Sequence, residues 1–166
     1  MTSFKNRLML ANGIFMSRLS YVIPVWGGCE SYLISALQIV QNNMMRTICR
    51  RGRMWPVREL LKETGWLSVR QLSTYHSLIQ IKKILSQRKP TYLYNHLVGN
   101  RRLLYARQIT RNIVITQEAR LSLTQSSWRW RTTELWKGLP EEMKKIQELK
   151  VFKSKLRNWV KDNIEI

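Results

Sequence analysis

The stretch Gly65–Gln87, GWLSVRQLSTYHSLIQIKKILSQ, decides how the rest of this chain is organised. Gly65 is suited to end one helix, and the side-chain oxygen of Ser68 is suited to cap the next. Because no glycine or proline follows from Ser68 to Gln87, the sequence predicts one long uninterrupted helix there.

Apolar residues lie on two faces of this predicted helix. At 3.6 residues per turn, one face carries Leu72, Tyr75 and Ile79, and another carries Leu78, Ile81 and Leu85. A helix that is apolar on two sides packs on two sides. We therefore expect an all-α fold, in which a helical bundle surrounds a central helix at about residues 68–87, with Trp66 and Leu67 packed at its start.

Further helices are expected on both sides of the central one. Their ranges are Thr2–Tyr21, Glu30–Arg51, Pro56–Thr64, Pro90–Leu97, Ser126–Lys137 and Leu149–Lys161. In Glu30–Arg51 the stripe of Leu33, Leu37, Val40, Met44 and Ile48 should face the core. Trp26, Trp136, Phe152 and Trp159 should also be largely buried. We expect two parts, a bundle at 1–99 and a basic connector with a small helical region at 100–166.

The charge of the chain points to a polyanionic partner. Its 29 basic residues outnumber 10 acidic ones, which gives a net charge of +19 over 166 residues. Nucleic acid is the leading partner and an anionic membrane surface the second, while a soluble basic domain without a partner is the plainest alternative. The apolar runs are too short to span a membrane, and between the two partners we expect nucleic acid and no membrane. Two cysteines make no disulfide framework, which favours a reducing compartment, cytoplasm or nucleus.

Catalytic chemistry has few candidate residues here. The only aspartate is Asp162, and no acidic residue lies between Glu63 and Glu118. A polymerase or nuclease that uses two metal ions needs converging carboxylates. His76 is better explained as a core or boundary histidine, because no nucleophile or acid adjoins it. We therefore expect no enzyme activity, no metal, no cofactor and no small-molecule ligand.

The basic residues fall into clusters that could contact phosphates. The candidate nucleic-acid-binding residues are Arg46, Arg50, Arg51, Arg53, Arg101, Arg102, Arg107, Arg111, Arg129 and Arg131. The run Trp128–Arg131 alternates aromatic and guanidinium groups, a pattern that can stack on bases and pair with phosphates. The alternative is that Trp128 belongs to the core, Trp130 is half-buried and the two arginines are solvated.

An ordered set of short motifs resembles a known family. The motifs are Leu19–Tyr21, Pro24–Gly28, Leu37-Gln38, Gln41-Asn42, Gly65–Val69, Tyr75-His76, Pro90–Leu93, Trp136, Leu139-Pro140 and Phe152-Lys153 through Leu156 to Trp159. Together they resemble the C-terminal, thumb-like region that follows the palm in reverse transcriptases of non-LTR (LINE-type) retrotransposons. One departure is Lys137, where members often have asparagine, and the zinc knuckle of some members is absent.

The resemblance implies a function that composition alone does not. Such polymerases copy element RNA into DNA at a target site, and their catalytic aspartates lie in the palm, upstream of the resembling region. The chain would then be a non-catalytic fragment that grips an RNA–DNA or DNA duplex, from a 5′-truncated element whose palm domain is missing. The alternatives are a host helical adaptor for other proteins, derived from such an element, and a cationic protein of membrane surfaces.

Overall fold

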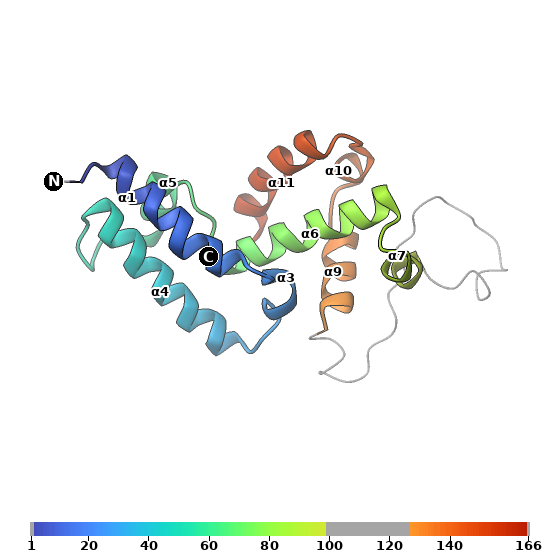
Figure 1. The fold of residues 1–166 in the computed structure, drawn as a ribbon, viewed down its shortest axis with the longest axis horizontal. Coiled ribbons are helices and arrows are strands. Elements are labelled where there is room, and N and C mark those ends of the chain that lie inside the picture. Colours follow the sequence, from blue (N-terminus) through green and yellow to red (C-terminus); the bar gives the residue numbers. More distant parts are fainter. Residues whose placement is uncertain (1, 99–126, 166) are drawn as a thin grey trace. The chain divides into compact units, whose positions relative to one another are not determined.

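The computed structural model describes residues 2–98 and 127–165, and every regular element among them is a helix (Figure 1). The elements are α1 (Phe4–Ala11), η1 (Asn12–Met16), α2 (Ser17–Ser20), α3 (Ile23–Trp26), α4 (Ser31–Cys49), α5 (Val57–Thr64), α6 (Val69–Gln87), α7 (Thr91–Val98), α9 (Trp128–Lys137), α10 (Glu141–Lys145) and α11 (Leu149–Asn163). The expected all-α fold class is confirmed.

The chain divides into two compact units. Unit 1 comprises Met1–Ser73 and Val160–Ile166, and unit 2 comprises Thr74–Trp159. The boundary between the units falls within α6 and again within α11. The boundary expected near residue 99 adjoins residues outside the described ranges, and it stays a prediction.

The central helix is built as the sequence predicts. Gly65 ends α5 with a left-handed φ of 70°. Ser68 Oγ accepts a hydrogen bond from the Gln71 backbone N–H, while Gln71 Oε1 accepts one from the Ser68 N–H. This reciprocal capping box satisfies donors that the first turn of α6 would otherwise leave unpaired.

The core of unit 1 lies between α1, α4 and α5, and α1 runs beside α4 in Figure 1. Its buried members are Ala11, Met45, Ile48, Cys49, Leu60, Leu61 and Trp66. Trp66 is tied to the π-helical segment η1 in two ways: its ring stacks on Phe15 at 6.0 Å between centroids, and its Nε1 donates to Asn12 Oδ1 at 2.9 Å. The first predicted helix is thus formed by α1, η1 and α2 in succession.

One glycine permits a close approach within unit 1. A Cβ added at Gly27 would collide with Ser73 Oγ and the Ile23 carbonyl oxygen. Because only glycine has no Cβ, it is the residue that lets the turn after α3 lie against the start of α6.

The face that α4 buries differs from the expected stripe. Ile34, Gln41, Met45, Ile48 and Cys49 are buried. Leu33 is 42% exposed and Val40 51% exposed, so the expectation for these two residues was wrong. The physical reason is a polar contact, since Gln41 Nε2 donates to the Leu67 carbonyl at 2.8 Å and so turns the helix toward the Gln41 side. Apolar spacing alone does not reveal that contact.

The core of unit 2 joins α6 to α9 and α11. The rings of Trp136 and Phe152 lie 6.3 Å apart, and both residues are buried, as the sequence predicts. Leu78, Ile81, Leu97 and Leu156 are fully buried beside them in this unit. Trp26, Tyr75 and Trp159 were expected to be largely buried and are half-buried. No helix within 2–98 or 127–165 is both long and apolar enough to cross a bilayer.

Candidate nucleic-acid interface

The first cluster of candidate arginines lies where α4 ends. Arg50 adopts a left-handed φ of 52°, and its backbone N–H bonds to the Arg46 carbonyl. This cap ends α4 at Cys49, so Arg50, Arg51 and Arg53 lie in the turn that leads to α5. The cluster is therefore presented by a turn rather than by a helix face.

Arg46 lies opposite the Leu33–Ile48 stripe in helical phase, so the sequence predicts that it faces solvent, but the structure differs. Its side chain is half-buried, and Nη1 donates to Asn43 Oδ1 at 3.2 Å. Its Nε is buried and has no acceptor among the described groups. The rotation of α4 toward Gln41 accounts for this position, because it moves Arg46 toward the edge of the packed surface. Arg46 is consequently a poorer candidate for a phosphate contact than its neighbours.

Arg51 is already engaged by side chains of unit 1. Its Nε lies 3.6 Å from Glu63 Oε2 on α5, and its Cζ lies 4.3 Å from the centroid of the Trp55 ring. An exposed ion pair contributes little by itself, but stacking on the indole orients the guanidinium. Arg51 thus contacts both Trp55 and Glu63, although its side chain stays 41% exposed.

Arg50 and Arg53 are exposed in the turn, as Arg51 is. On α5, Glu59 pairs with Lys62 at 3.0 Å and Glu63 pairs with Arg51. Arg58, in the first turn of α5, is exposed as well. The turn and the start of α5 therefore form a positive surface, which we call the arginine turn and define as residues 50–58.

Two apolar residues of the arginine turn were missed by the sequence analysis. Met54 is 94% exposed and Trp55 is 40% exposed. The signal is present in the run Arg50–Trp55, RRGRMW, which combines arginines with a glycine and ends in two large apolar residues.

Most of the remaining candidates fall on residues that the structure does not describe. Arg101, Arg102, Arg107 and Arg111 lie outside the described residues, as does the side chain of Arg129. On α9, Arg131, Trp128 and Trp130 are half-buried, and Trp128 Nε1 is buried without an acceptor among the described groups. The half-burial expected as the alternative for Trp130 is confirmed. Helix α9 belongs to unit 2, whereas the arginine turn belongs to unit 1.

Two titratable side chains, Cys49 and His76, lie in packed surroundings. Burial raises the pKa of the Cys49 thiol, and the adjacent Glu63 carboxylate raises it further, so Cys49 stays protonated. Burial lowers the pKa of His76, helped by the cations Lys153 and Lys83. Within residues 2–98 and 127–165, no three histidine, cysteine or carboxylate residues gather as metal ligands.

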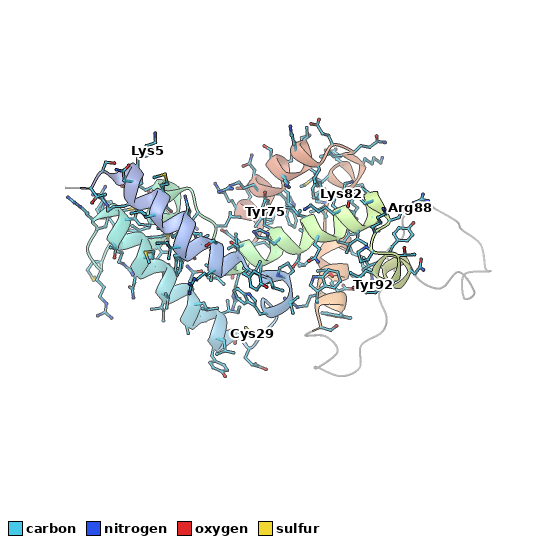
Figure 2. All side chains as sticks on the ribbon, in the orientation of Figure 1. Lys5, Cys29, Tyr75, Lys82, Arg88 and Tyr92 are labelled. Carbon is cyan, nitrogen blue, oxygen red and sulfur yellow. The ribbon has the colours of Figure 1, made fainter. Side chains whose placement is uncertain are left out.

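A buried lysine of α6 was also missed (Figure 2). Lys82 is 9% exposed, and its Nζ donates to the Lys144 carbonyl at 2.9 Å. The same ammonium lies 5.4 Å from the Phe152 ring centroid and 5.9 Å from that of Trp136. Burial lowers its pKa. Since it meets the last turn of α10, where helix carbonyls are unpaired, Lys82 joins α6 to α10 within unit 2.

No family model matches the chain, and neither a curated protein nor a solved structure matches it.

Proposed function

We propose that this chain binds nucleic-acid duplexes without catalysis and that the arginine turn contacts their phosphates. One observation carries the proposal: Arg50 and Arg53 are exposed together in the turn between α4 and α5. A net charge of +19 makes a polyanion the natural partner of such a surface.

The mode of binding follows from the chemistry of this surface. Guanidinium groups pair with phosphate oxygens, and such contacts position a protein on a duplex without reading its sequence. An RNA–DNA hybrid is closer to A-form, with a wide and shallow minor groove, so duplex shape should set any preference. We expect similar affinities for unrelated sequences.

The family resemblance supplies a biological setting for this proposal. We infer a thumb-like fragment of a retrotransposon reverse transcriptase, which would hold element RNA paired with DNA at the target. We expect no polymerase activity from the chain, because it has a single aspartate, Asp162. Primer extension on an RNA template with magnesium should give no product, and template-dependent incorporation by the pure protein would contradict this.

The test of phosphate binding is the salt dependence of affinity. The double change Arg50→Gln and Arg53→Gln should lower the slope of log affinity against log salt by about 0.9 for each phosphate interaction that it removes. Affinity should fall equally for unrelated duplex sequences.

The matched control removes two charges from unit 2. Lys145 and Lys155 are exposed there, and changing both to Gln should leave the slope close to that of the wild type. An equal reduction of the slope in the two double variants would show that only net charge matters. An unchanged slope in a folded arginine variant would contradict a role for the turn.

A second candidate function, a helical adaptor for another protein, is favoured by a different observation. Unit 1 has an apolar groove of about 590 Å³ beside the exposed stripe of α4. Its lining residues are Ile14, Phe15, Arg18, Leu19, Trp26, Leu37 and Met44. The occupant would be an amphipathic helix with an acidic residue opposite Arg18, the only charged residue of the lining.

The adaptor has its own test. Leu37→Glu should abolish capture of a partner protein from nuclease-treated extract while leaving duplex affinity unchanged. Capture that disappears on nuclease treatment alone would contradict the adaptor and favour the duplex.

A further inference from the structure

The arginine turn displays apolar surface that phosphate binding does not explain. Met54 is 94% exposed, although a methionine side chain left in water forgoes the free energy of burial. Trp55 beside it is 40% exposed. Single exposed apolar residues are common on proteins, but here two large ones adjoin between the exposed cations Arg53 and Arg58.

Contacts within unit 1 restrict the Trp55 ring. The Trp55 backbone N–H bonds to the Gly52 carbonyl at 3.1 Å, which folds the turn back on itself. The Arg51 guanidinium lies over the ring at 4.3 Å, and Glu63 on α5 anchors Arg51 in turn. A ring restricted in this way loses less conformational entropy when it contacts a ligand.

The ligand that suits this arrangement has flat apolar faces and adjacent negative charges. Nucleic-acid bases have both, since aromatic side chains stack on bases while arginines contact the flanking phosphates. Apolar side chains such as methionine also insert beside bases as wedges. Inside a duplex the base faces are covered by their neighbours, whereas at a duplex end one face is open.

We propose that Trp55 stacks on the base exposed at a duplex end, with Met54 packed beside it and Arg50 and Arg53 on the adjacent phosphates. The inference rests on the proposed function and adds a preference for ends to it. An anionic membrane is the competing ligand for an exposed tryptophan among arginines. It is less favoured because membrane-surface binding generally uses the long apolar face of a helix, not one short turn.

The experiment compares two DNA duplexes of the same sequence. One has open ends, and in the other both ends are closed by hairpin loops. The wild type should bind the open duplex roughly fivefold more tightly or better, as expected for one base–aromatic stack. Trp55→Leu should bring this ratio close to one and leave the affinity for the closed duplex, with its salt slope, unchanged.

The controls separate stacking by Trp55 from the loss of any exposed aromatic residue and from loss of folding. Tyr92→Leu removes another exposed aromatic residue, on α7 in unit 2, and should keep the wild-type ratio. Met54→Ser should lower the ratio less than Trp55→Leu, and its almost complete exposure makes loss of folding no concern. Circular dichroism should be the same for all variants.

Each other outcome overturns one proposal. Equal wild-type affinity for the two duplexes would overturn the preference for ends, whereas salt-dependent binding of the closed duplex would leave the proposed function intact. Absence of any salt-dependent binding would contradict the proposed function as well. If Trp55→Leu weakens binding to phosphatidylglycerol vesicles and leaves the duplex ratio unchanged, the turn is a membrane contact and the inference is wrong.

Discussion

Gln41 Nε2 donates a hydrogen bond of 2.8 Å to the backbone carbonyl of Leu67, across 26 residues of sequence. The glutamine is fully buried, and its neighbour Gln38 accepts from the Val69 backbone N–H at 2.8 Å through Oε1. Two amides of α4 therefore satisfy backbone groups at the entry to α6. This pairing fixes which face of α4 is buried in unit 1.

Replacement of Gln41 by leucine should destabilise the protein although it adds an apolar side chain to the core. The change removes the partner of the Leu67 carbonyl in a buried place, which costs about 1–3 kcal/mol. Urea unfolding followed by circular dichroism measures it. Gln87→Leu, an exposed position at the end of α6, is the control and should stay within about 0.5 kcal/mol of the wild type. Equal stability of the two variants would mean that the amide contact is dispensable.

The rotation of α4 makes a prediction opposite to that of the sequence. Met45→Ala should cost about 2–5 kcal/mol, because Met45 is fully buried. Val40→Ala should change stability by no more than about 0.5 kcal/mol, because Val40 is largely exposed and alanine favours helix. Thermal and urea unfolding of both variants provide the measurement. A larger destabilisation at Val40 than at Met45 would mean that α4 buries the stripe expected from apolar spacing.

The buried ammonium of Lys82 should make stability rise with pH in the alkaline range. Burial lowers its pKa in the folded state, so the unfolded chain binds more protons between that value and the ordinary value of about 10.4. The free energy of unfolding should therefore increase as pH rises through this window. Lys82→Met should flatten the increase, and Lys83→Met, at the exposed neighbouring position, should retain it. Identical pH profiles for the two variants would show that Lys82 is not the source of the increase.

His76 should also make the stability of the protein rise with pH, but in a lower pH range. Its folded-state pKa lies below the usual value of about 6.5 because of burial and the nearby cations Lys153 and Lys83. Between these two pKa values the unfolded state binds more protons than the folded state. The free energy of unfolding should therefore decrease as the pH falls from about 6.5 toward the folded-state pKa of His76. Denaturant midpoints measured from pH 7.5 to pH 5.5 test this. His76→Gln should show a weaker decline, and an equal decline would exclude His76 as its source.

The sequence by itself determined the central helix and its ends. Gly65 with its positive φ, and the capping pair Ser68 and Gln71, act through groups within a few residues of each other. Such local interactions can be predicted from the sequence, because the donors, the acceptors and the permitted φ angles all belong to neighbouring residues. The bounds of α6 and the burial of Trp66, Trp136 and Phe152 agree with that prediction.

Only the tertiary structure decided the orientation of α4 and the state of the arginines. Leu33 and Val40 have the spacing of a core stripe, yet Gln41 is buried instead because its amide meets a carbonyl that is distant in sequence. Arg51 looks like its neighbours in the sequence, but it contacts Glu63 and Trp55. Apolar periodicity shows that a helix has a buried side, whereas the partners that meet in space determine which residues of that side, and which charges, remain at the surface.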